Sequence, residues 1–126
     1  MRDIVHNVGV QQCIAPADLA ATTTGASVDL LGCDSVAFIV TAGARTASGA
    51  FTVGMEESDD NTTFAAVPAN LVQAPVSGNI AANSTVKVGY RGYKRYVRPV
   101  LTKGSGTSMF ASVIALRGNV ADRPVA

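Results

Sequence analysis

The chain has few of the residues on which most enzymes and metal proteins depend. Its 126 residues include no tryptophan, one histidine and two cysteines, and charged residues make up only 15%. Any Ser–His–acid or Cys–His site would have to use His6, and no HExxH, CxxC or phosphate-loop pattern occurs. The sequence therefore predicts no catalytic residue, no cofactor and no metal, and we expect a protein that is not an enzyme.

Cysteines and long apolar runs are also scarce. Cys13 and Cys33 are too few for a disulfide framework or a zinc site, and both two free thiols and a single bridge fit the sequence. The start, "MRDIVHNVGV", lacks a signal-peptide pattern, and no apolar run approaches the ~20 residues of a membrane span. We expect a protein made in a reducing cytoplasm that has no membrane partner.

Small apolar and polar residues dominate what is present, and their pattern is that of strands. Alternation with a period of two runs through "DSVAFIVTAG", "AFTVGMEES", "STVKVGY", "KRYVRPVLTK" and "TSMFASVIALRG". Turn signals separate these runs at intervals of roughly 8–12 residues, which is typical of sandwiches. The prediction is an all-β protein: an antiparallel β-sandwich or jelly roll of about seven or eight short strands.

The first 25 residues show no sustained period. We therefore predict an extended N-terminal arm over residues 1–25, ordered on a partner, and a sandwich domain over residues 26–126. Residues 68–83 form a connection too long for a tight hairpin, so the chain should cross there to another sheet or edge. Pro99 lacks a backbone donor, which favours a sheet edge or a bulge at that position.

Charge is unevenly distributed along the chain although the net charge is only +1. Residues 1–60 hold two bases and eight acids, a net −6, whereas residues 61–126 hold eight bases and one acid, a net +7. Two arrangements fit this division. The halves can interleave so that their charges neutralise locally, or the two signs can lie on different surfaces and meet neighbouring subunits.

The stretch "YRGYKRYVRPVLTK", residues 90–103, gathers all three tyrosines and much of the positive charge. The candidate partner-binding residues of the chain lie here: Arg91, Lys94, Arg95 and Arg98. Tyr90, Tyr93 and Tyr96 are three apart, and a bend near Gly92 would keep them from forming one stacking platform. We therefore expect no nucleic-acid partner, and rings that cover the ends of a sandwich.

The acidic stretch "EESDDN", residues 56–61, is the one other cluster of side chains that could bind a ligand. Its oxygens could in principle bind calcium, but the spacing does not match a helix–loop–helix site. Asp and Asn satisfy their own backbone in turns, so a solvated hairpin turn is the preferred interpretation.

Four phrases follow one another along residues 26–126: "GASVDLLGCDSVAFIVTAGA", "FTVGMEESDDNTTFAAV", "YKRYVRPVLTKGSGTSMFASVIALRG" and a closing "DRPVA". Their order resembles that of small structural proteins encoded in the head genes of tailed bacteriophages and prophages. The resemblance is one of overall layout, and neither Cys33 nor Pro99 matches a family role.

The resemblance implies a decoration or cement protein of the virion. Such a protein would sit on the capsid surface, link neighbouring major capsid protein subunits, and form a homo-oligomer, either a dimer or a trimer. Two alternatives stay open. One is a tail or head–tail joining component, and the other is a carbohydrate-binding β-sandwich, against which the absence of tryptophan counts.

Overall fold

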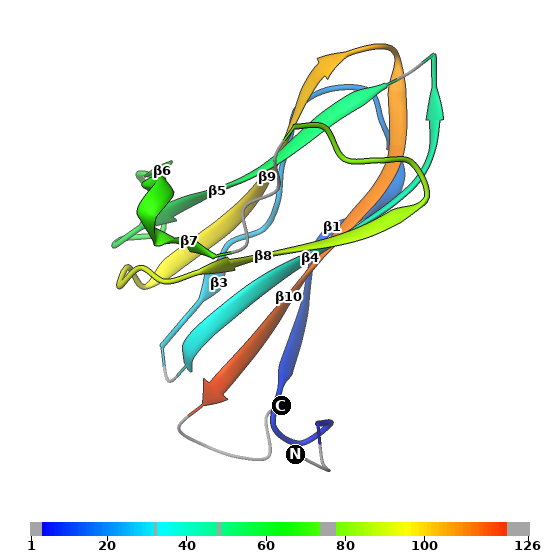
Figure 1. Ribbon diagram of the computed structural model, residues 1–126. Coiled ribbons are helices and arrows are strands. Elements are labelled where there is room, and N and C mark those ends of the chain that lie inside the picture. Colours follow the sequence, from blue (N-terminus) through cyan, green and yellow to red (C-terminus); the bar gives the residue numbers. More distant parts are fainter. Residues whose placement is uncertain (1–3, 32, 48, 74–77, 121–126) are drawn as a thin grey trace.

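Two antiparallel sheets of five strands each form the molecule (Figure 1). The structure is a computed structural model that describes residues 4–31, 33–47, 49–73 and 78–120, without the side chains of residues 33, 34, 119 and 120. Sheet A has the order β1 (Gly9–Leu19), β10 (Ser108–Val120), β4 (Cys33–Thr46), β8 (Ser84–Tyr90) and β7 (Val72–Gln73). Sheet B has the order β2 (Thr23–Thr24), β9 (Tyr96–Ser105), β5 (Ala50–Ser58) and β6 (Ala65–Ala66), and β3 (Val28–Asp29) also pairs with β9.

The core lies between the inner faces of the two sheets. Sheet A contributes Phe38, Val40 and Val113, and sheet B contributes Leu101 and Val97, all fully buried. These residues occupy alternate positions of their strands, which is how a half-buried strand places its apolar side chains. The prediction of an all-β antiparallel sandwich is therefore confirmed, while the jelly-roll winding stays a prediction.

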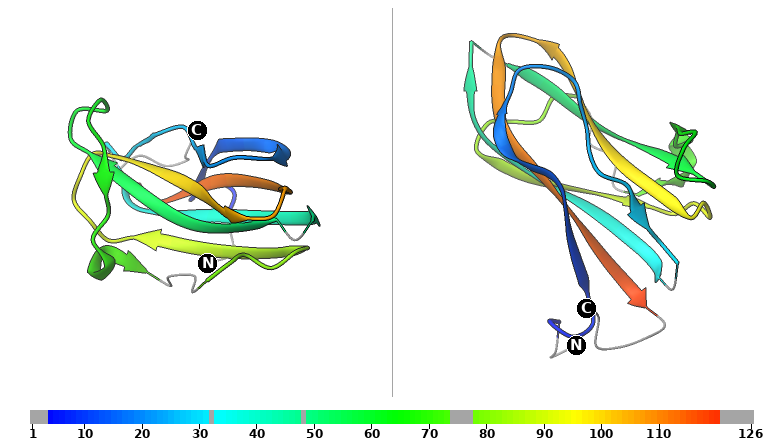
Figure 2. Two further views of the ribbon diagram at one scale, coloured as in Figure 1. Left: turned by 90° about the horizontal axis from the view of Figure 1, so that it is seen from above. Right: turned by 180° about the vertical axis from the view of Figure 1, so that it is seen from behind.

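Long hairpins join the sheets at one end of the molecule. The turn after β4 leads from sheet A into β5 of sheet B, and the turn after β9 leads from sheet B into β10 of sheet A. Figure 2 shows both crossings, with β5 beside β9 and β10 beside β1 and β4. At the other end, the 3₁₀ turn η1 (Ala69–Leu71) lies between β6 of sheet B and β7 of sheet A.

Most predicted strands are present close to their predicted bounds. The run "STVKVGY" is β8 and the run "AFTVGMEES" is β5. The long connection from residue 68 crosses between the sheets as expected. The described residues hold ten strands rather than seven or eight, because four of the ten have only two residues.

The N-terminal segment differs from its prediction as an arm. Residues 9–19 are strand β1, which pairs with β10 along most of its length, and β2 lies within the same predicted arm. Cys13 and Ile14 from this segment are buried in the core. A boundary at residue 25 therefore does not separate an arm from a sandwich, because the sandwich already includes β1 and β2.

Pro99 lies inside a sheet rather than at an edge or a bulge. It is buried in β9, opposite Met55 of β5, with β2 and β3 on the other side of β9. β2 pairs with Val100 and Leu101, and β3 pairs with Tyr96 and Val97, so Pro99 falls in the gap between them. The missing N–H therefore costs no ladder hydrogen bond.

Cys13 is a free thiol, which answers the question of a bridge for that residue. Burial raises its pKa to about 11, although a backbone hydrogen bond with Ala115 opposes the shift. A thiol with so high a pKa carries little thiolate at neutral pH, so Cys13 behaves as a small apolar core residue. The side chain of Cys33 lies outside the described residues.

Candidate binding surface

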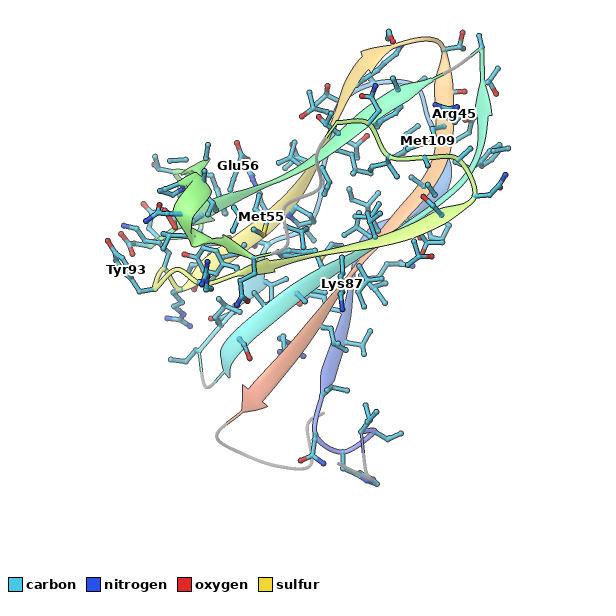
Figure 3. All side chains as sticks on the ribbon, viewed as in Figure 1. Arg45, Met55, Glu56, Lys87, Tyr93 and Met109 are labelled. Atoms are coloured by element: carbon cyan, nitrogen blue, oxygen red, sulfur yellow. The ribbon has the colours of Figure 1, made fainter. Side chains whose placement is uncertain are left out.

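The corner that joins sheet A to sheet B is the most distinctive surface feature. β8 ends at Tyr90 and β9 begins at Tyr96, so residues 91–95 carry the chain from one sheet to the other. We call residues 90–98 the basic corner. Its tip is Tyr93, whose side chain is 86% exposed and lies far from the core in Figure 3.

Tyr90 anchors this corner from below. Its ring is buried, and its hydroxyl group donates a hydrogen bond to Glu57 Oε1 at 2.7 Å. The Tyr90 hydroxyl oxygen also accepts a hydrogen bond from the backbone N–H of Lys94 at 3.1 Å. Burial, and then the hydrogen bond with Glu57, raise the pKa of Tyr90 far above its ordinary value. Gly92 packs on the end of this ring, where any Cβ would overlap the hydroxyl group. The path of the corner is thus set by the buried ring of Tyr90.

Ion pairs with the acidic half of the chain hold the flanks of the basic corner. The Lys94 ammonium lies 2.6 Å from Asp59, and Arg95 donates twice to the carboxylate of Asp29, at 2.9 Å each. The Arg95 hydrogen bond is the main cause that lowers the pKa of Asp29 to about 2. Solvent screens both exposed pairs, so their direct contribution to stability is small. Their second effect is geometric, because they tie the corner to β3 and to the turn after β5.

Arg98 forms a third ion pair, on the outer face of sheet B. Its guanidinium contacts Glu56 Oε1 through Nε at 2.8 Å and through a terminal nitrogen at 2.7 Å, and it stacks 3.9 Å from the centre of the Phe64 ring. Arg98 and Glu56 are directly opposite in the β5–β9 pairing. The two oppositely charged halves of the chain therefore neutralise each other locally at three places.

The four candidate partner-binding residues are brought to one corner but are not equivalent. Lys94, Arg95 and Arg98 face carboxylates of their own chain. Arg91 is exposed, and within the part of the chain that the structure describes its side chain has no ion-pair partner, although its backbone N–H donates to Leu71 at 2.8 Å. Arg91 is therefore the one of the four whose charge is available to another molecule.

The three tyrosines of the corner have three different environments. Tyr90 is buried, Tyr96 is half-buried with the Arg95 guanidinium 5.0 Å from its ring centre, and Tyr93 is exposed with the Lys94 ammonium 5.6 Å from its ring centre. Because the ring of Tyr90 is buried, the three rings do not form one exposed stacking platform. The sequence pattern alone does not distinguish Tyr93 from the other two tyrosines. Its position between Gly92 and Lys94, at the middle of the corner, is the one feature of the sequence that indicates its exposure.

The turn "SDDN" is present as a capped turn at the end of β5. Asp60 accepts hydrogen bonds from the backbone N–H groups of Thr62 and Thr63 at 2.9 and 3.0 Å and from the Ser58 hydroxyl at 2.8 Å, and Asn61 has a φ of 60°. These hydrogen bonds lower the pKa of Asp60 to about 2, and the bond from the Thr63 N–H has the largest effect. Oδ1 of Asp60 is thus committed to the turn, which accounts for this carboxylate without a metal.

Other candidates for chemistry are weak. Within the described residues, no group of three or more His, Cys, Asp or Glu side chains could hold a metal, and no helix is long and apolar enough to cross a membrane. A hollow of about 360 Å³ between β5 and β8 is lined by Val53, Met55, Val72, Val88 and neighbouring small residues, without a titratable side chain. The described part of its lining offers no acid, base or nucleophile to a ligand.

No protein-family model matches this chain, and no curated protein is similar to it.

Proposed function

We propose that this chain is a non-enzymatic structural protein of a phage virion, which binds the outer surface of the capsid and cements neighbouring major capsid protein subunits. The proposal draws on the β-sandwich fold and on the resemblance in layout to phage head proteins. It gives the protein a place on the capsid surface after synthesis in the host cytoplasm. It requires a surface that acts by contact alone, and the basic corner meets this requirement.

The observation that carries the proposal is the exposure of Tyr93 on a fixed corner. A large aromatic side chain at 86% exposure buries much apolar area when a partner covers it. Tyr and Arg are also the residues enriched at the energetic centres of protein interfaces. Because Tyr90, Gly92 and the ion pairs already hold the corner, little conformational freedom remains to be lost on binding.

Arg91 supplies the charge complementarity in this proposal. Its free guanidinium can pair with a carboxylate on a capsid subunit while Tyr93 enters a neighbouring apolar depression. Lys94, Arg95 and Arg98 then act through position, because their intrachain pairs hold the corner in shape. Of the four basic residues, only Arg91 therefore attracts the capsid surface directly.

The test is co-sedimentation with empty, DNA-free shells of the virus that encodes the protein. Truncation of an interface centre costs about 2 kcal/mol or more, which corresponds to roughly thirtyfold weaker attachment. We expect losses of this size for Tyr93→Ala and for Arg91→Glu.

Arg45→Glu is the matched control, because Arg45 is also an exposed arginine and lies on the opposite side of the molecule (Figure 3). It should bind shells as the unchanged protein does. The proposal fails if the unchanged protein does not bind empty shells. Binding to isolated tails or to a glycan array in place of shells would favour the joining-component or the carbohydrate alternative.

A further inference from the structure

The outer face of sheet A is unusually apolar for a surface that faces water. On β10, Phe110, Ile114 and Leu116 point outward, since Met109, Ala111, Val113 and Ala115 between and beside them are buried in the core. Opposite them on β4 lie Ala37 and Ile39, and Val10 of β1 continues the row of Leu116. Val10 is 58% and Phe110 49% exposed. An antiparallel sheet with one solvated face normally alternates apolar with polar residues, and these rows do not.

The relief of this face is uneven. Phe110, Ile114 and Leu116 stand on β10, whereas β4 presents Ile39 among the smaller residues Ala37, Thr41 and Gly43. A hollow of about 200 Å³ is lined in part by Ala37 and Leu116, and one of about 270 Å³ is lined in part by Thr41, Gly43 and Phe110. The face thus carries both projections and depressions in adjacent strands.

We propose that a second copy of this chain covers this face, with the outer faces of the two A sheets packed together. The two-fold axis would run parallel to the strands, between β10 and β4. Each β10 residue then faces the β4 residue that is its neighbour in its own sheet: Leu116 faces Ala37 of the second copy, Ile114 faces Ile39, and Ser112 faces Thr41. Leu116 then meets the smaller Ala37, Ile114 meets the equally apolar Ile39, and the two hydroxyl residues Ser112 and Thr41 meet each other.

Sheet twist and charge also favour a second copy. Two sheets pack well face to face when both have the same right-handed twist, which two copies of one sheet necessarily share. The charged residues in these rows lie at the two edges, with Asp18 on β1 opposite Phe110, and Lys87 on β8 opposite Ile39. The rotation places β1 of one copy over β8 of the other. Because Asp18 lies in the row of Phe110 and Lys87 in the row of Ile114, neither charge is placed against a like charge.

Lys87 has a specific partner in this arrangement. It shares a row with Ile39, Ile114 and Gln12, in that order across sheet A, and it projects from β8 away from β5 (Figure 3). Rotation about the axis brings Lys87 over Gln12 of the second copy. The Gln12 amide oxygen can accept a hydrogen bond from the ammonium group there, and no like charges meet.

The size of the face suits a reversible dimer. Four strands about 4.8 Å apart and seven residues that rise about 3.3 Å each make a face of roughly 20 Å by 23 Å. The planar area of roughly 460 Å² is below the ~800 Å² per partner of a standard interface, as expected for a weak, reversible dimer. Dimerisation is also separable from capsid attachment, because the basic corner does not belong to this face.

Sedimentation velocity across a range of protein concentrations tests the inference first. The unchanged protein should shift from monomer to dimer as its concentration rises, and Ile114→Lys should stay monomeric. Val100→Lys is the matched control, since Val100 points outward from the centre of sheet B and is half-buried as Ile114 is. Circular dichroism checks that each variant folds, and Phe110→Ser serves if Ile114→Lys does not.

A disulfide tests the orientation. Gln12 and Lys87 lie three strands apart in one chain, about 14 Å, too far for a bridge within a copy. The double variant Gln12→Cys, Lys87→Cys should therefore form a covalent dimer under mild oxidation, whereas neither single variant should. A protein that is monomeric at every concentration, or a dimer that survives Ile114→Lys and forms no such bridge, would overturn the inference.

Discussion

Single residues explain why β9 can hold a proline at the centre of a sheet. The carbonyl of Pro99 accepts the backbone N–H of Gly25 at 2.8 Å, so the side of Pro99 that lacks a donor also faces Gly25. Gly25 links β2 to β3, and a Cβ there would lie 2.7 Å from Cγ of Pro99 and 3.1 Å from the Ile14 side chain. The glycine thus lets the chain pass close over the proline ring.

We predict that Gly25→Ala lowers the free energy of unfolding by about 1–3 kcal/mol, the usual effect of overpacking in a close-packed site. Gly54→Ala is the control. Gly54 lies in β5 beside the same strand, but its added methyl group would meet no atom within 4 Å. That variant should be unchanged or slightly more stable, because alanine restricts the unfolded chain. Urea unfolding of the two variants measures the difference, and equal losses would contradict this account of Gly25.

Residue-level features differ in how far sequence could predict them. The turn chemistry of Asp60 and Asn61 is local, and the hairpin turn was expected from "SDDN" alone. The roles of Gly25, Tyr90 and Arg91 depend on residues far along the chain, so no local pattern indicates them. The sequence also shows the basic cluster. It does not show which of these charges are paired, because their partners lie far along the chain.

At the scale of elements, sequence alternation with a period of two predicts those strands that keep one face buried along their whole length. β4 contains the predicted run "DSVAFIVTAG", β10 contains "TSMFASVIALRG" from its second residue, and both strands extend beyond these runs at the C-terminal end. β1 was missed because its register with β10 shifts twice, between Gln12 and Ile14 and between Ile14 and Ala17. Each shift moves the side chains to the other face, so a strand with two shifts shows no sustained alternation.

We predict that Ile14→Ala destabilises the protein by about 2–4 kcal/mol, because Ile14 is buried in the core and its truncation leaves a cavity. Ile4→Ala removes the same atoms from an exposed side chain before β1 and should change stability by no more than about 0.5 kcal/mol. Thermal and urea unfolding distinguish the two. A stable Ile14→Ala protein would restore the view of residues 1–25 as an arm outside the sandwich.

At the scale of the whole molecule, sheet membership was beyond the reach of the sequence pattern. Periodicity gives the faces of each strand but not its neighbours, and here β9 and β10 are consecutive yet belong to different sheets. Charge order was equally ambiguous until the pairing was known. Within the described residues, three ion pairs join the acidic half to the basic half, and this interleaving makes the stability of the fold depend on carboxylates.

Acid should therefore weaken the whole fold over a defined range. The pKa of Asp29 is held near 2 chiefly by Arg95, and that of Asp60 near 2 chiefly by the backbone N–H of Thr63. An aspartate in an unfolded chain has a pKa of about 3.9. A carboxyl group whose pKa is lower in the folded state stabilises the fold above the unfolded value and loses that effect as the pH falls through the folded value. Both contributions should thus be present at neutral pH and disappear between about pH 4 and pH 2.

We predict that the melting temperature falls through this range and that the double variant Asp29→Asn, Asp60→Asn falls less steeply. At pH 7 that variant should melt at a lower temperature, because it lacks the ion pair between Asp29 and Arg95 and the charged acceptor that Asp60 supplies in the turn. Asp18→Asn is the control, because Asp18 is exposed on β1 and forms no ion pair within the described residues. Differential scanning calorimetry from neutral pH to pH 2 measures all three proteins. If the double variant keeps the full acid dependence, the carboxylates that bind Arg95 and the Thr63 amide do not control the stability of the sandwich, and other acidic groups must.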